Sequence, residues 1–322
     1  MSATRHRSLS LACLALAVTW CAPPAQAQSS SSTAPPASTR GVLLLAHGGN
    51  KEWNANVRDI AAEVNKTEPT EVAFGMADRA TLQEGIDKLT GRGVTQIVAV
   101  PLFVSSHSSV IEATKYLLGL RPEAPPELMH FAMDHGGGDS PSLGVDKGAA
   151  GTLKTTPVRC AVPLRMAAAL DRHPILAEIL TARAEAISRE PAHEVLVLVA
   201  HGPNENAENE LWLADLRAVA KLIEAKRPFA MVEVTTVRDD ADAPIREQAT
   251  RQFRSIVSAA NERGYRVLVA PVLLSYGGIE NGIRQRLDGL EHVMSPNGLL
   301  PDPRVSEWVI DVAGSGSGVR GE

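Results

Sequence analysis

Aromatic side chains are scarce in this sequence, where Phe, Tyr and Trp make up only 4% of the 322 residues. The core must therefore be built mainly from Val, Leu, Ile and Ala. Hydrophobic residues reach 44% and charged residues 21%, which is an ordinary globular composition over a length that suits two domains. An aliphatic core of this kind suits a parallel β-sheet that is buried on both faces.

Cysteine is also rare, and its positions exclude a disulfide-based fold. Of the three cysteines, Cys13 and Cys21 lie near the N-terminus, in a segment that we interpret as a signal peptide, so only Cys160 remains. A single cysteine cannot form an intrachain disulfide, and the fold must depend on its core. We interpret Cys160 as a small buried apolar residue.

The first 27 residues have the three-part layout of a secretory signal peptide. Arg5 and Arg7 form a basic start, residues 9–20 are an uncharged apolar stretch, and Ala25 and Ala27 supply the small residues of a cleavage site. The apolar stretch is too short to span a membrane, so we expect no stable membrane insertion after cleavage. These features predict an exported, periplasmic protein.

Two further features concern the chain around and after this segment. A lipoprotein anchored through Cys21 is a weaker alternative, because the residues before it fit the lipid-attachment pattern poorly. The Ser/Pro/Ala-rich residues 28–39 predict a disordered linker.

Removal of residues 1–27 takes away two arginines and no acid, which leaves 30 basic against 37 acidic residues and a net charge of −7. An acidic exported protein is a poor candidate for nucleic-acid binding.

An internal repeat organises the rest of the sequence. The segment VLLLAHGG at residues 42–49 recurs as LVLVAHGP at residues 196–203, and VPLFV at 100–104 corresponds to APVLL at 270–274. Repeated β-α-β-α-β units imply a parallel sheet in each half, with right-handed crossovers. We predict an α/β fold of two similar lobes, each a small parallel sheet flanked by helices, with a cleft between the lobes.

The boundaries follow from this repeat. We predict an N-terminal lobe over residues 40–190, a C-terminal lobe over 191–313 and a disordered Gly/Ser-rich tail over 314–322. Residues 134–156 contain HGGG and KGAAG and almost no apolar periodicity, which predicts a long surface insertion in the first lobe.

Apolar periodicity predicts the individual elements. The expected strands cover residues 42–46, 72–74, 96–104, 127–132, 158–162, 195–200, 231–237, 266–274 and 305–312. The expected helices cover residues 53–64, 80–89, 109–118, 174–187, 208–225, 243–261 and 280–290.

Two histidines follow strands that we expect to be neighbours. His47 comes directly after the first predicted strand, and His107 follows the third. In the common strand order 2-1-3-4, which the sequence itself does not show, the first and third strands are adjacent, and ligands bind beyond their carboxyl ends. Neutral imidazoles bind divalent transition metals, and a histidine that titrates near neutrality can also accept protons. Metal insertion into a tetrapyrrole requires both actions.

Simpler interpretations stay open for each of these residues. A histidine after a strand can be a local hydrogen-bonding residue, and Glu112 can be a solvated acid at a helix start. Gly48 and Gly49 could cradle a phosphate, but they do not continue into a Walker or dinucleotide-binding pattern, so we expect no nucleotide. His130 and His135, which flank the predicted insertion, are most simply incidental.

The combination of motifs resembles a known family. LLLAHGG at residues 43–49, followed by PLFVSSH at 101–107, is similar to the sirohydrochlorin cobaltochelatase/ferrochelatase family, the class II tetrapyrrole chelatases. The stretch LDRHPILAEILTAR at 170–183 also resembles that family, and the doubled layout resembles its long, two-lobed form. The resemblance covers residues 40–290 apart from the insertion.

The resemblance implies an activity and a site. It implies that His47 and His107 bind the metal and remove protons, with Glu112 as a candidate assistant. Candidate binding residues in or beside the motifs are Gly48, Ser105, Ser106 and His201. The implied partners are a sirohydrochlorin-type tetrapyrrole and a divalent metal substrate, Co²⁺ or Fe²⁺, with Ni²⁺ also compatible with imidazole. The oligomeric state is left open.

The sequence also departs from the family pattern. Tyr276-Gly-Gly stands where His107 would repeat in the second lobe, and Phe74-Gly-Met76 stands where many relatives carry a carboxylate. An exported metal or tetrapyrrole carrier without turnover is therefore an alternative to a chelatase. A periplasmic receptor for a small molecule or phosphate is a third and weaker one.

Overall fold

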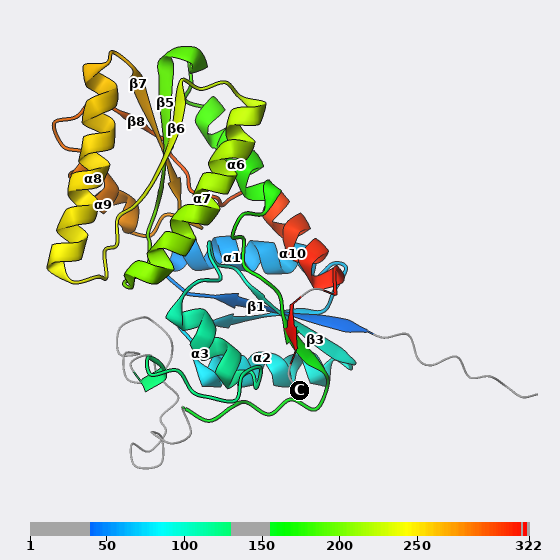
Figure 1. Cartoon of the computed structure of the whole chain (residues 1–322). Helices are drawn as coiled ribbons and strands as arrows, with labels where there is room; N and C mark the ends of the chain where they lie inside the picture. The colour runs from blue at the N-terminus through cyan, green and yellow to red at the C-terminus, as the bar shows by residue number, and fades with distance from the viewer. Residues whose placement is uncertain (1–38, 130–154, 317, 321–322) are drawn as a thin grey trace, which may run out of the picture. The chain divides into compact units, whose positions relative to one another are not determined.

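The computed structural model describes residues 39–129, 155–316 and 318–320, which form two α/β lobes (Figure 1). The predicted signal peptide, nearly all of the predicted linker, residues 134–154 of the predicted insertion, and His130 and His135 lie outside the described residues. The first part of the chain forms β1 (Arg40–Ala46), α1 (Lys51–Val64), β2 (Thr70–Phe74), α2 (Arg79–Gly91), β3 (Gln96–Pro101), α3 (Ser109–Leu117), β4 (Leu164–Met166) and α6 (Pro174–Glu185). The second part forms β5 (Glu194–Ala200), α7 (Asn206–Lys226), β6 (Met231–Thr236), α8 (Ala243–Glu262), β7 (Arg266–Val272), α9 (Ile279–Arg286), β8 (Val293–Met294), α10 (Arg304–Gly314) and β9 (Val319–Arg320).

The first sheet has the strand order β2-β1-β3-β4-β9 and is parallel except for β9. Strand β1, which lies between β2 and β3, is apolar on both faces because both faces are covered. Leu43 and Leu45 pack with α2 and α3, whereas Val42 and Leu44 pack on the opposite face with α1. The continuous apolar run in the sequence therefore reports a strand buried between two layers of helices.

The second sheet repeats this arrangement with the order β6-β5-β7-β8. Val197 and Val199 of β5 pack with Phe253 of α8 on one face, and Leu198 packs on the other. The first three strands of each lobe have the order 2-1-3 that was assumed from the sequence, whereas the strands in the fourth place, β4 and β8, are not those that were expected there. The carboxyl ends of β1 and β3, and those of β5 and β7, are consequently adjacent.

The last helix of each lobe packs on the other lobe. Helix α6 follows the first sheet in sequence but contacts α7 and β7, and α10 follows the second sheet but contacts α1 and β3 (Figure 1). One buried apolar cluster includes Leu176 of α6, Leu198 of β5, Val57 of α1 and Val309 of α10, so it is shared by both lobes. The predicted boundaries at residues 190 and 313 therefore separate the two similar stretches of sequence, but they do not separate two independently packed cores.

The C-terminal region differs from its prediction. The expected strand at residues 305–312 is helix α10, and the spacing of its buried residues Val305, Trp308 and Val309 is helical. The predicted disordered tail is corrected in part, because β9 pairs antiparallel with β4. Gly318 permits this approach, since a Cβ there would lie 2.2 Å from the carbonyl oxygen of Met166.

Two other expected strands are not found. Residues 158–162 do not join the sheet, and β4 begins after them, at Leu164. Their alternation is explained by packing, because Val158, Cys160 and Val162 all lie against the α2 and α3 side of the first lobe. Of the expected strand at 127–132, the described part is helical at residues 128–129.

None of the helices in the described ranges is both long and apolar enough to cross a lipid bilayer.

The exchange of helices predicts that α10 is essential to the first lobe. Trp308 is 1% exposed, so Trp308→Ala should lower the free energy of unfolding by about 3–5 kcal/mol through lost burial and a cavity. Glu307→Ala, at an exposed position of the same helix, should change it by less than about 0.5 kcal/mol. Urea denaturation measures both. Similar values for the two variants would show that α10 is not docked as described.

Candidate functional site

The loop after β3 presents His107 at the carboxyl end of the first sheet, and its two serines hold the loop in place. Oγ of Ser105, which is 3% exposed, accepts a hydrogen bond from the backbone N–H of His107 at 3.1 Å. Ser106 donates its backbone N–H and its hydroxyl to the two carboxylate oxygens of Asp171, at 2.5 and 2.8 Å. Both predicted binding serines are thus engaged in shaping the loop, and a role in binding stays a prediction.

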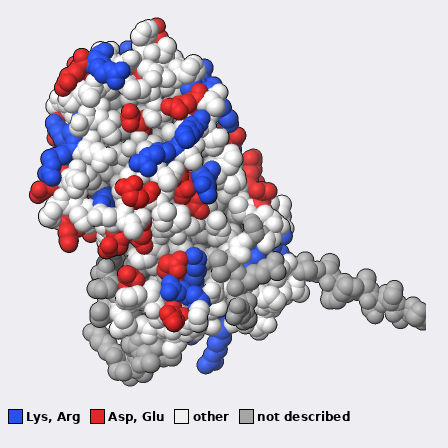
Figure 2. Space-filling model, viewed as in Figure 1, with Lys and Arg blue, Asp and Glu red and all other residues white. Residues whose placement is uncertain are grey.

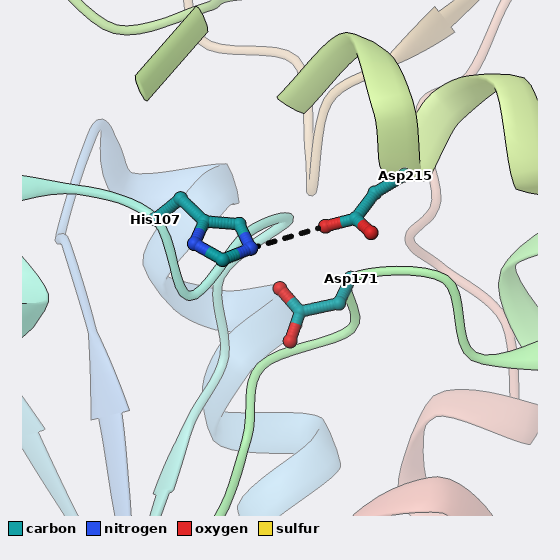
Figure 3. Close-up of side chains that lie close together, drawn as sticks. All are labelled: His107, Asp171 and Asp215. Atoms are coloured by element: carbon teal, nitrogen blue, oxygen red, sulfur yellow. Dashed lines mark ion pairs between the residues drawn. The ribbon is translucent and has the colours of Figure 1, made fainter. Parts of the chain in front are cut away.

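Helix α7 of the second lobe completes the surroundings of His107. Nε1 of Trp212 donates to the backbone carbonyl of His107 at 2.6 Å. One turn further along α7, Oδ2 of Asp215 lies 3.4 Å from Nε2 of His107 (Figure 3). Possible ligand atoms of His107, Asp171 and Asp215 all lie within 4.8 Å of one another. The structure therefore gathers an imidazole and two carboxylates at the junction of the lobes.

Burial and neighbouring acids raise the pKa of two carboxyl groups at this junction, those of Asp215 and Glu208. Burial raises the pKa of Asp215 above its usual range, and the charge of Asp171 raises it further, while His107 and Arg172 oppose the shift. Burial also raises the pKa of Glu208, at the start of α7, together with the charges of Glu205 and other nearby acids. The negative charge of the acidic side chains at this junction is therefore only partly neutralised by basic side chains.

The distribution of charged side chains on the surface agrees with this local excess of negative charge. Figure 2 shows acidic side chains along the margin of the second lobe where α7 and α8 begin, and this part of the sequence contains Glu205, Glu208, Glu210, Asp239, Asp240 and Asp242. A surface of one sign raises the local concentration of ions of the opposite sign. This edge of the second lobe favours cations.

His47 occupies a different environment. Its ring is exposed, Nδ1 lies 2.6 Å from the carbonyl oxygen of Gly48, and the ring meets Trp53 edge-on with centroids 6.4 Å apart. Gly48 has a φ of +87°, a conformation that favours glycine at this turn. The strand ends that carry His47 and His107 are adjacent, but within the described ranges His47 is not part of the group formed by His107 and the aspartates.

Glu112 and His201 also have local partners. Glu112 lies on α3 and forms ion pairs with Lys115 at 2.7 Å and Arg121 at 2.8 Å, as expected for a solvated helix acid. Nε2 of His201 lies 3.4 Å from Oδ2 of Asp240. The catalytic role predicted for Glu112 and the binding role predicted for His201 stay predictions.

The loop of the second lobe that corresponds to the His107 loop has a structural role, and Gly277 stands in it where His107 stands in the first lobe. The hydroxyl of Tyr276 donates to the carbonyl of Ser295 at 2.6 Å, and burial raises the pKa of Tyr276 to about 12. The loop after His201 is also fixed, because Arg238 donates to the carbonyls of Pro203 and Asn204. The two halves of the repeat therefore differ in chemistry at equivalent positions.

In each lobe, the first helix contacts a loop of the other lobe. Trp212 of α7 bonds to the loop after β3, and Asn56 of α1 donates to Oγ of Ser275 in the loop after β7 at 3.0 Å. Helices α1 and α7 are repeat counterparts, and Ser275 corresponds to Ser105. Each lobe thus uses its first helix to hold the loop of the other, as in an isologous interface between two copies.

Two hollows of the described surface lie away from this junction, at the amino ends of the strands. One is bordered by Arg266 and His292, and the other by Arg40 and Arg165. The predicted cleft between the lobes stays a prediction.

Asp171 and Asp215 were missed by the sequence analysis. Asp171 lies within the stretch at residues 170–183 that carries part of the family resemblance, where it could have been singled out. Asp215 lies on the buried side of α7, next to Leu216 and one turn before Val219. A carboxylate on the apolar side of a helix is a signal of function, because an unpaired buried charge is costly.

Two solved structures share this fold over most of both chains. SirB from Bacillus subtilis with Fe³⁺ has a TM-score of 0.56 and 14% sequence identity, over 85% of this chain and 94% of that one. The sirohydrochlorin chelatase SirB from Bacillus subtilis subspecies spizizenii in complex with cobalt has a TM-score of 0.53, with the same identity and coverage. The described fold is therefore that of a two-lobed α/β protein, similar to these two structures.

Sequence similarity relates the first lobe of this chain to one protein family. Residues 41–187 match the family model CbiX. The sirohydrochlorin cobaltochelatase of Methanococcoides burtonii is 34% identical over 87 residues, which are 26% of this chain and 66% of that protein, slightly under two thirds of its length. The similarity to the class II tetrapyrrole chelatases therefore covers the first lobe, over residues 41–187.

The raised pKa of Asp215 predicts that this residue lowers the stability of the metal-free protein. Asp215→Asn should raise the free energy of unfolding at neutral pH, by about 0.5–2 kcal/mol, as for typical stabilising substitutions. The ionised carboxylate is disfavoured in the folded state, so the difference should shrink as the pH falls through the raised pKa and the wild-type residue takes up its proton. Urea denaturation of chelator-treated protein at several pH values measures it. Lower stability of the variant at neutral pH contradicts this account.

Proposed function

We propose that this protein inserts a divalent metal ion into a sirohydrochlorin-type tetrapyrrole. The supporting observation is that His47 and His107 each follow one of two neighbouring parallel strands, in a chain whose first lobe matches the chelatase family. Co²⁺ and Fe²⁺ are the proposed metal substrates. The N-terminal sequence supports export, so the proposed place of action is the periplasm.

The reaction requires a donor for the ion and acceptors for two pyrrole protons, and the two histidines suit these tasks unequally. His107 faces carboxylates, a surrounding that favours a cation. His47 is exposed and near Trp53, whose ring offers an apolar surface against which a flat macrocycle could lie. We therefore assign ion delivery mainly to His107 and proton removal to His47. Glu112 is held in ion pairs and is a weaker candidate.

A carrier without turnover is the second candidate. It is favoured by Gly75 and Met76 at the position where relatives carry a carboxylate, and by Gly277 at the position that corresponds to His107. A carrier would bind the metal or the tetrapyrrole with fixed stoichiometry and release it unchanged.

The proposal is tested by mixing the purified protein anaerobically with sirohydrochlorin and Co²⁺, or Fe²⁺ in a parallel series, and following the absorbance of the macrocycle. We expect insertion faster than the spontaneous reaction, and a rate about 10²–10⁴-fold lower for His47→Ala if its imidazole accepts protons. His193→Ala, at an exposed position before β5, should match the parent protein. Stoichiometric binding with no acceleration would favour the carrier, and an unchanged rate for His47→Ala would refute the assignment of His47.

A further inference from the structure

The group formed by His107, Asp171 and Asp215 draws on both lobes. His107 comes from the loop after β3, Asp171 from the segment after β4, and Asp215 from α7 of the second lobe (Figure 3). All three direct possible ligand atoms into one small volume, with every pair of those atoms within 4.8 Å. Because the residues are far apart in sequence, their convergence results from the packing of the lobes.

Asp215 is the member that its surroundings leave unsatisfied. The residue is 9% exposed, its side chain 12% exposed, and Oδ2 is buried without a hydrogen-bond partner among the described residues. The 3.4 Å separation from Nε2 of His107 is that of an ion pair, not of a well-formed hydrogen bond. A buried carboxylate oxygen without such a partner costs free energy, unless another group supplies the missing interaction.

Asp171 is oriented for the same role. Its two oxygens accept hydrogen bonds from Ser106, and each oxygen keeps a further lone pair. Such bonds to a carboxylate are typical of the outer shell that orients metal ligands. The nearest cationic side chain, Arg172, reaches Oδ1 of Asp215 only at 3.9 Å and is 75% exposed, so it can move aside.

We propose that Nε2 of His107 and the carboxylates of Asp171 and Asp215 together bind a divalent transition-metal ion in a site that bridges the two lobes. A neutral imidazole with two carboxylates carries a charge of −2, which matches such an ion. The mixed nitrogen and oxygen donors suit Co²⁺ or Fe²⁺ better than Mg²⁺, for which imidazole is a poor ligand. Three protein ligands leave coordination positions open.

This site gives the two histidines different roles, ion binding for His107 and proton removal for His47. The ion is held mainly by His107 with the aspartates, and His47 keeps its proposed role in proton removal. The role of the site in loading the ion rests on the proposed chelatase function. Ion binding itself does not, since it needs neither the tetrapyrrole nor turnover.

The experiment titrates chelator-treated protein with Co²⁺ alone. Trp212 bonds to His107 and lies one turn before Asp215, so bound paramagnetic Co²⁺ should quench its fluorescence. Isothermal titration calorimetry gives the stoichiometry and affinity. We expect one ion per chain, quenching that is largely lost in Trp212→Phe, and an increase in Tm on Co²⁺ addition.

Matched variants locate the ion. Asp215→Asn should bind Co²⁺ at least about tenfold more weakly and lose the increase in Tm, although it folds at least as stably without metal. Glu224→Gln, at an exposed position of the same helix, should bind like the parent protein.

Three results would overturn the site: no stoichiometric binding, full binding by Asp215→Asn, or loss of binding in His47→Ala alone. Confirmed binding without metal insertion would count against the chelatase and leave the site intact.

Discussion

Helices α6 and α10 each leave the lobe that precedes them in sequence and fill the face of the other lobe, so a single apolar cluster runs through both. Protein interiors are close-packed, and separation of the lobes would expose this whole surface to water. The rest of the structure depends on this constraint. It holds α7 against the loop after β3, which places Trp212 on the carbonyl of His107 and Asp215 beside its ring.

The two lobes share the order of their first three strands, but their corresponding loops differ in chemistry. The same elements meet in both directions across the junction, through Trp212 on one side and Asn56 on the other. Yet the loop after β3 ends in a histidine, whereas the equivalent loop after β7 has Tyr276, bonded inward, and glycine. A pseudo-symmetric frame therefore supports one candidate ion site, to which the second lobe contributes a carboxylate in place of a second histidine.

Stability and function oppose each other at this junction. Elsewhere buried acids are well paired: hydrogen bonds from Ser188, Arg189 and Arg266 outweigh the effect of burial and lower the pKa of Glu194. Asp215 has the opposite shift, and its Oδ2 has no hydrogen-bond partner among the described residues. Such costs concentrate where a protein needs a reactive or ion-binding group. The contrast singles out Asp215 among the buried acids, as a group that is completed by binding.

The sequence by itself determined much of the fold. The apolar runs of β1 and β5 indicated strands buried on both faces, and the recurring motifs indicated two similar lobes. The adjacency of the strand ends that carry His47 and His107 depended on a strand order that only the structure shows. The helical spacing of Val305, Trp308 and Val309 was also present, although it was interpreted as a strand. Only the tertiary structure decided which lobe each last helix covers and which residues join His107. The physical reason is that local patterns record which side of an element is buried, whereas the partner on that side is selected by packing between segments distant in sequence.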